Sequence, residues 1–149
     1  MYKFKEVLQF LNNIPYINHG GCAIAALSIH RWLNKYGIKS SIIYCYRDSD
    51  DLHYSLFIDY LNTNPYGLGR PAGCAHAFIK IGKQLFDSRG RVKKHTYSRF
   101  IEISEKSAVT SLQYENDWNG SFNRRHIAKI EKFLEISLND IKKSTWCEV

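Results

Sequence analysis

Three side chains in this sequence have the types that nucleophilic catalysis uses: a thiol, an imidazole and a carboxylate. Cys22 follows two glycines and begins a stretch with helical spacing, and His76 and Asp87 come later in the chain. A thiol at a helix start gains thiolate character from the unpaired amide groups and the dipole there. An imidazole and a carboxylate are the usual partners that complete the activation. We therefore predict that these three residues form the catalytic set.

The chain around His76 predicts how the imidazole meets the carboxylate. Residues 75–81 and 84–88 are short β-rich segments joined by Gly82-Lys83, and a two-residue connection with a leading glycine favours a type II′ hairpin. Side chains alternate along a strand, so this turn places His76 and Asp87 on one face as diagonal neighbours, typically ~7–8 Å apart at Cα. A three-residue turn would place the carboxylate on the opposite face. The predicted pair depends on this register.

The other predicted elements surround the hairpin. Apolar residues at helical spacing, and β-rich runs bounded by turn residues, are the signals used. They predict helices over 2–11, 22–36, 52–61 and 124–141, strands over 39–46, 100–103 and 108–114, and a loop over 62–73 that could border a cleft. With 149 residues, the chain predicts a single α+β domain, residues 1–149, in which N-terminal helices and a C-terminal helix pack on a small antiparallel sheet.

The order of these features resembles a known group of enzymes. A Gly-Cys pair at a helix start, a following strand, a strand that opens with His76-Ala-Phe and a hairpin partner that carries Asp87 are similar to the transglutaminase-like branch of the papain-like cysteine hydrolases. The stretch 76–90, with its closing Asp-Ser-Arg-Gly, also resembles uncharacterised bacterial and phage proteins. The resemblance covers residues 18–90. It implies a papain-like fold and a Cys22, His76, Asp87 triad that works without a cofactor.

The residues around the thiol depart from the pattern of that superfamily. Ala23 follows Cys22 where an aromatic residue often stands, and no glutamine precedes it as an oxyanion donor. We take Asn18 as the candidate donor beside the backbone N–H of Cys22, because a neutral amide stabilises an oxyanion without competing for the proton. His19 and Gly21 complete the predicted oxyanion and substrate-binding set.

The first functional hypothesis is a cysteine-dependent hydrolase or acyltransferase. Cys22 would attack an amide or thioester carbonyl, His76 would carry the proton, and Asp87 would orient the imidazole. Resolution of the acyl-enzyme by water gives a peptidase, amidase or deamidase, and resolution by an amine gives transglutaminase-type chemistry. The expected substrate is a peptide, a protein or a small molecule that contains an amide.

The charge of the chain leaves a binding function as the alternative. Twenty-one Lys and Arg against 14 Asp and Glu give a net charge of +7. The basic residues gather at 89–95 and 124–126, and no motif of an RNA-binding sheet or zinc finger accompanies them. Such a charge attracts acidic partners. The alternative is therefore a phage- or bacteria-encoded binding or inhibitory module on a papain-like shell, which engages a host protein or nucleic acid.

The cysteines allow a third hypothesis. A structural Zn²⁺ site could use two imidazoles and two thiols, from His19, Cys22, Cys74 and His76. We expect no metal, because the Cys-x-His spacing is tighter than that of usual zinc ligands. The sequence starts without a signal-peptide core, and no stretch approaches the roughly 20 apolar residues of a membrane helix. We therefore expect a cytoplasmic protein with reduced thiols and no membrane contact.

Overall fold

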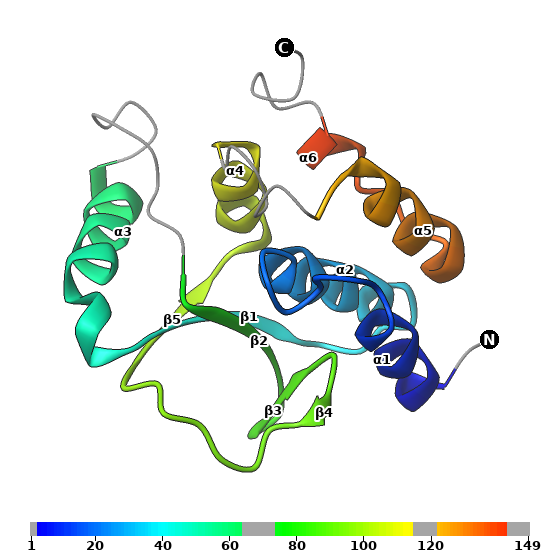
Figure 1. Ribbon diagram of the computed structural model, residues 1–149, viewed down its shortest axis with the longest axis horizontal. Helices are drawn as coiled ribbons and strands as arrows, with labels where there is room; N and C mark the ends of the chain where they lie inside the picture. Colours follow the sequence, from blue (N-terminus) through cyan, green and yellow to red (C-terminus); the bar gives the residue numbers. More distant parts are fainter. Residues whose placement is uncertain (1–2, 64–73, 115–121, 143–149) are drawn as a thin grey trace.

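The computed structural model describes residues 3–63, 74–114 and 122–142, which form an α+β fold around a five-stranded antiparallel sheet (Figure 1). The strand order is β4-β3-β2-β1-β5. The strands are β1 (Ser41–Tyr46), β2 (His76–Ile81), β3 (Gln84–Asp87), β4 (Gly90–Arg91) and β5 (Arg99–Ile103). The helices are α1 (Phe4–Asn12), α2 (Cys22–Lys35), the 3-10 helix η1 (Asp48–Asp50), α3 (Asp51–Thr63), α4 (Glu105–Tyr114), α5 (Arg124–Leu134) and α6 (Asn139–Lys142).

Strands β2 and β3 form the hairpin that the sequence predicts. Ile81 pairs with Gln84, so the turn contains two residues. Gly82 has a φ of 61°, while the second turn residue is not in a positive-φ conformation. A positive φ at the first central position alone is the type II′ pattern. The predicted register is confirmed, and it puts His76 and Asp87 on one face of the sheet.

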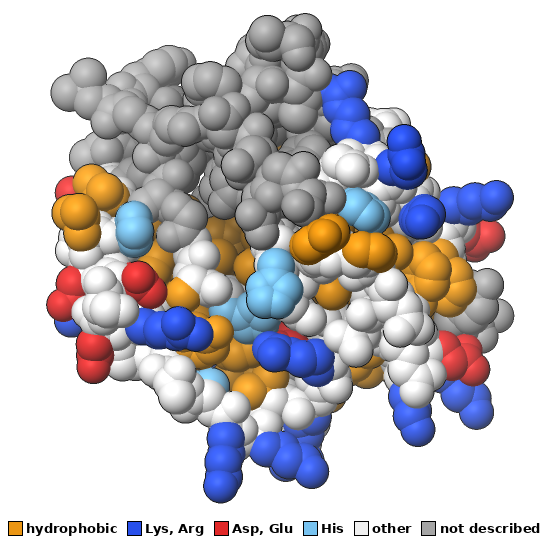
Figure 2. Space-filling model, in the orientation of Figure 1, with side chains coloured by type: hydrophobic (Ala, Val, Ile, Leu, Met, Phe, Trp, Pro, Cys, Tyr) orange, Lys and Arg blue, Asp and Glu red, His pale blue; other side chains and the backbone are white. Residues whose placement is uncertain are grey.

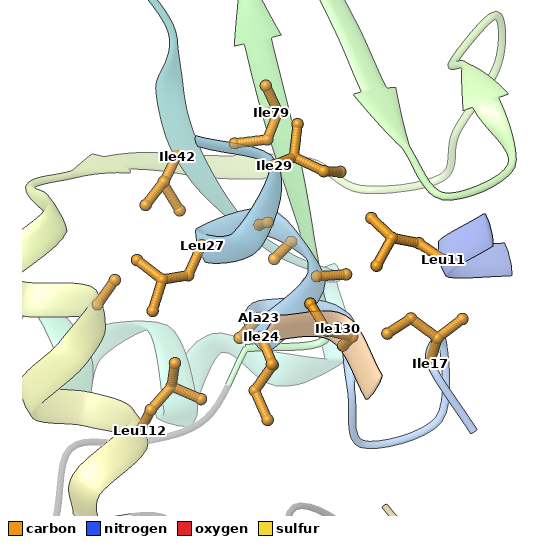
Figure 3. Close-up of a cluster of buried hydrophobic side chains, with 14 of the residues drawn as sticks. Leu11, Ile17, Ala23, Ile24, Leu27, Ile29, Ile42, Ile79, Leu112 and Ile130 are labelled. Carbon is orange, nitrogen blue, oxygen red and sulfur yellow. The ribbon is translucent and has the colours of Figure 1, made fainter. Parts of the chain in front are cut away.

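Helix α2 lies at the centre of the hydrophobic core. Small and aliphatic side chains line its length, and side chains from α1, α4, α5 and strands β1 and β2 pack against them (Figure 3). Burial of such apolar surface is the main favourable term in folding. Because α2 packs against β2 within this core, its first residue is held close to the start of that strand. The labelled core residues are Leu11, Ile17, Ala23, Ile24, Leu27, Ile29, Ile42, Ile79, Leu112 and Ile130.

Different parts of the chain cover the two faces of the sheet. In Figure 1, helices α1, α2 and α5 lie on one side, and the segment between β4 and β5 crosses the other. On this second face a smaller apolar cluster forms around Ile43, Cys45 and Phe78, with Val92 and Tyr97 of the crossing segment packed against it. Residues 92–98 therefore cover the face on which His76 and Asp87 lie.

The predicted strand over 108–114 is wrong, because this segment belongs to helix α4. The hydroxyl of Ser104 accepts a hydrogen bond from the Ser107 N–H at 3.1 Å, which caps the helix start. Ala108 and Leu112 are fully buried one helical turn apart. Packing of this face on the core decides the conformation, and it outweighs the weak preference of the β-branched residues between them for strand.

The predicted helix over 124–141 is divided into α5 and α6. Glu135 adopts a left-handed conformation with φ 54°, which ends α5. The Lys35 ammonium at the end of α2 donates to the carbonyls of Leu134 and Glu135 at 3.1 and 3.0 Å. A cation on the last carbonyls of a helix stabilises its terminus. The expected loop over 62–73 lies outside the described residues from position 64 onward.

Separate patches of Lys and Arg side chains lie on the described part of the face seen in Figure 2. Lys and Arg side chains are spread across this view, and acidic side chains stand mainly at its left and right margins. Among the described residues, no helix has both the length and the apolar character needed to cross a bilayer.

Candidate active site

Cys22 occupies the first position of α2, where helix N–H groups have no partner within the helix. The turn before it requires glycine at position 21. A Cβ on Gly21 would come within 2.9 Å of the Cα and carbonyl oxygen of Ile17 and of the Phe122 ring. Residues 17–21 therefore pass too close to the core for any side chain at this position. This packing fixes the start of α2 and leaves the Cys22 thiol half-buried.

His76 and Asp87 form a buried hydrogen bond. The Nε2 atom of His76 lies 2.9 Å from Oδ2 of Asp87, and the two residues are only 3% and 7% exposed. Arg89 adds a backbone N–H at 2.8 Å and its Nη2 at 2.7 Å to the same carboxylate. Burial raises the pKa of Asp87, but the hydrogen bonds from His76 and Arg89 outweigh it and lower the pKa to about 2. The carboxylate is therefore charged at neutral pH.

The Cys22 thiol lies within hydrogen-bonding reach of the imidazole. Since Nε2 is bonded to Asp87, the ring nitrogen left for the thiol is Nδ1. Burial lowers the pKa of His76, but the hydrogen bonds to Asp87 and Cys22 and the charges of both partners raise it to about 9. A high imidazole pKa beside a low thiol pKa favours a thiolate–imidazolium pair.

Three groups lower the pKa of Cys22: the Cys74 thiol, the His76 imidazole and the Ala23 N–H. A hydrogen bond from the Cys74 thiol lowers its pKa most, burial opposes this, and the hydrogen bond and charge of His76 lower it further. The N–H of Ala23 also points to the sulfur from the first turn of the helix. Together they hold the pKa of Cys22 well below its usual value.

Aromatic rings enclose the imidazole on the second face of the sheet. Tyr97 stacks on His76 with 5.9 Å between ring centroids and 13° between planes, and Phe78 meets it edge-on at 4.9 Å. The guanidinium of Arg47 lies 5.5 Å from the centre of the Tyr97 ring. This cover lowers the local dielectric, which strengthens the hydrogen bond between His76 and Asp87.

The predicted oxyanion residues occupy the loop before α2. The side-chain amide of Asn18 donates to the Ser88 hydroxyl at 3.0 Å, and that hydroxyl also lies 3.3 Å from the Asn12 side-chain oxygen. Asn18 thus ties the loop to the residue next to Asp87. His19 is exposed and lines an open pocket of about 480 Å³, together with residues 12–18 and Arg89. This pocket borders the His76–Asp87 pair through the arginine.

The structure adds three residues that the catalytic hypothesis did not contain. Tyr97 and Arg89 contact His76 and Asp87, and Cys74 contacts Cys22. The Asp-x-Arg spacing on the hairpin was visible in the sequence as a local signal for Arg89. The contact of Tyr97 depends on the path of residues 92–98, for which the sequence carries no local signal.

Within residues 3–63, 74–114 and 122–142, no group of three or more His, Cys, Asp and Glu side chains is arranged to hold a metal ion. His19, Cys22, Cys74 and His76 all lie within these ranges.

Comparisons of the chain with models of protein families, with curated proteins and with solved structures give no match. The chemistry of the site must therefore be judged from its own side chains. These comprise a half-buried thiol at a helix start, an imidazole in contact with it and a buried carboxylate behind the imidazole.

Proposed function

We propose that this protein is a cysteine-dependent hydrolase or acyltransferase that acts on an amide or thioester bond. We further propose that its α+β fold is papain-like, of the transglutaminase-like type. The observation that supports the function best is the continuous contact from the Cys22 thiol through the His76 imidazole to the buried Asp87 carboxylate. This order of groups is the general signature of an activated nucleophile: a base next to it and a third group that orients the base.

In the first step the Cys22 thiolate attacks the substrate carbonyl carbon. The carbonyl π electrons move onto oxygen, and the N–H groups at the start of α2 are the donors placed to stabilise that oxyanion. The carbon–nitrogen bond then breaks, and the His76 imidazolium gives its Nδ1 proton to the leaving amine. For a thioester the leaving group is a thiol, and the same proton is transferred.

In the second step the acyl-enzyme is resolved. Water or an amine attacks the thioester carbonyl, and the now neutral His76 accepts its proton at Nδ1. The Cys22 thiolate leaves and the ion pair is restored. Asp87 stays bonded to Nε2 throughout, so Nδ1 is the ring nitrogen that faces the sulfur in both steps.

The substrate is accommodated in part by the open pocket lined by residues 12–19 and Arg89. Its volume of about 480 Å³ lies within the ~300–1,000 Å³ range of ligand pockets. Side-chain amides and a guanidinium among its lining residues suit a polar acyl or leaving group, such as a peptide segment. The basic surface would favour substrates that carry acidic residues.

The test measures the rate of iodoacetamide alkylation at each cysteine against pH, by mass spectrometry, in the wild type, in His76→Ala and in His95→Ala. His95 is the matched control, since it also stacks on Tyr97, with 6.0 Å between ring centroids, and belongs to the same ring cluster. We expect fast labelling of Cys22 that persists below about pH 7, and a rate at least about tenfold lower in His76→Ala only. Acylation of Cys22 by p-nitrophenyl acetate should follow the same order.

An ordinary reactivity of Cys22 would refute the proposed activity. If Cys22 reacts as an ordinary thiol with a pKa of about 8.5, and loss of His76 changes nothing, the protein is not a cysteine hydrolase. The alternative of a basic binding module would then be favoured. Its binding to a nucleic acid or to an acidic protein should weaken steeply with added salt and survive Cys22→Ser.

A further inference from the structure

The proposed mechanism gives no chemical role to Cys74, although this residue touches the nucleophile. Cys74 precedes His76 by two positions, and the chain bends between them at Ala75. The Ala75 N–H donates to the Cys45 carbonyl at 3.0 Å, one residue away from the register in which Cys45 pairs with His76. Both the Cys74 thiol and the His76 imidazole form hydrogen bonds with Cys22, and the two cysteines pack together at the edge of the main core.

Both thiols are also accessible. Cys22 and Cys74 are half-buried at the edge of the main core, and a hydrogen bond joins them. Thiolate character and access to solvent are the two properties that make a cysteine react with peroxides. A neighbouring thiol determines the final product, because the sulfenic acid formed first condenses with it to a disulfide.

We propose that Cys22 and Cys74 form a modification site, at which a hydroperoxide converts the two thiols into a reversible disulfide. The contact between the two partly exposed thiols supports this proposal. Only the expected effect of the disulfide on activity, which is loss of the nucleophile, rests on the proposed function.

The chemistry balances with the hydroperoxide as the oxidant. The Cys22 thiolate attacks one peroxide oxygen, the O–O bond breaks, and the products are a sulfenic acid on Cys22 and a hydroxide or alkoxide. Cys74 then attacks the Cys22 sulfur, the S–S bond forms and the S–O bond breaks. The hydroxide that leaves takes up the thiol proton as water. With hydrogen peroxide the sum is two thiols and one peroxide to one disulfide and two waters.

Cys45 provides an internal control for this reaction. It lies directly opposite His76 on β1, but its side chain is fully buried. Burial and the nearby charge of Cys22 raise the pKa of Cys45 to about 12, and its thiol points to the Ile43 carbonyl at 3.9 Å. A protonated, buried thiol is inert to peroxide. Position in the same neighbourhood is thus not sufficient for oxidation.

The experiment treats the full-length wild type, Cys74→Ser and Cys45→Ser with one to ten equivalents of hydrogen peroxide. Non-reducing peptide mapping by mass spectrometry then identifies each product. In the wild type and in Cys45→Ser we expect a linked Cys22–Cys74 peptide that disappears with dithiothreitol. In Cys74→Ser we expect Cys22 to proceed to the sulfinic acid, which dithiothreitol does not reverse.

The proposal is overturned if the wild type yields Cys22 sulfinic acid as fast as Cys74→Ser does, without the linked peptide. It is also overturned if the first disulfide joins Cys22 to another cysteine. The peptide map requires no substrate, so it separates the two proposals. A linked peptide in a protein that never acylates Cys22 would support the thiol pair and refute the hydrolase, and acylation without the linked peptide would do the reverse.

Discussion

The Asp87 carboxylate combines burial with a full set of donors. His76 and Arg89 together supply hydrogen bonds to both of its oxygens, at 2.7 to 2.9 Å. A buried carboxylate without such donors would bind a proton, since burial favours the neutral form. Here the donors outweigh burial, and the carboxylate charge that they stabilise acts together with Cys22 to keep His76 protonated beside the thiol.

We predict that Asp87→Asn removes an acid-dependent part of the stability. The pKa of Asp87 is about 2 in the folded protein and 3.8 in its ordinary state, so its contribution is present above pH 3.8 and is lost as the pH falls toward 2. A shift of this size corresponds to about 2 kcal/mol. Urea unfolding from pH 5 to pH 2 should show a decline in the unfolding free energy that is smaller by this amount in the variant.

The control for this prediction is Asp48→Asn. Asp48 is an exposed carboxylate that accepts a hydrogen bond from the Ser98 hydroxyl at the surface. Its variant should retain the acid-dependent decline of the wild type. Equal declines in all three proteins would contradict the role given to Asp87.

At the scale of elements, the parts predicted correctly are those with local signals. The hairpin is specified by a Gly82-Lys83 turn, and α2 by small and aliphatic residues followed by Gly37, which has a φ of 72° just after the helix end. Helix α4 was missed although Ser104 is a local capping residue, because the packing that favours helix here involves residues far apart in the sequence. Ser111, in its middle, is buried and lies 3.0 Å from the Tyr44 hydroxyl of β1, a contact that no short window of sequence reveals.

The same distinction holds for the candidate site. The pairing of His76 with Asp87 followed from strand alternation and turn length, which are local properties. The contact of Cys74 with Cys22 depends on how α2 packs against β2, and the Tyr97 stack depends on the path of a segment between strands. Such contacts arise from packing over long sequence distances. They were therefore beyond the reach of the sequence signals.

The turn before α2 yields a prediction about how an element positions the nucleophile. In Gly21→Ala the new Cβ would meet backbone atoms of Ile17 at 2.9 Å, so residues 17–22 must move. We expect a loss of about 1–3 kcal/mol in the unfolding free energy, as for other overpacked sites. We also expect the iodoacetamide labelling rate of Cys22 below pH 7 to fall several-fold, because the thiol moves relative to His76.

A glycine at the other end of the same helix separates the two effects. Gly37 has a positive φ but no atom within 4 Å of an added Cβ, so Gly37→Ala costs about 1–2 kcal/mol from backbone strain alone. Its Cys22 labelling rate should equal that of the wild type. If both variants lower the labelling rate equally, the effect reflects general loss of stability rather than the placement of the thiol.

At the scale of the whole molecule, one arginine of α2 joins the C-terminal half to the core. Its Nε lies 2.6 Å from the Glu105 carboxylate of α4, its Nη2 lies 2.6 Å from Asp140 of α6, and its Nη1 donates to the Ser137 carbonyl at 2.7 Å. This residue, Arg31, has a side chain only 17% exposed. The hydrogen bond to Asp140, together with Glu105, raises the pKa of the guanidinium, while Arg31 lowers the pKa of Asp140. Three helices thus share one partly buried cation.

We predict that Arg31→Met lowers the unfolding free energy by about 2 kcal/mol. Removing one partner of a fully buried ion pair costs more, but here both carboxylates are partly exposed. Arg99→Met is the matched comparison. Its Nε lies 2.7 Å from Asp51, but the two side chains are 43% and 61% exposed, so its loss should cost less than about 1 kcal/mol and vanish in 1 M salt. Urea unfolding at low and high salt measures both. Similar costs for the two variants would mean that burial of Arg31 adds nothing, and that hydrophobic packing alone holds α4 and α6 on α2.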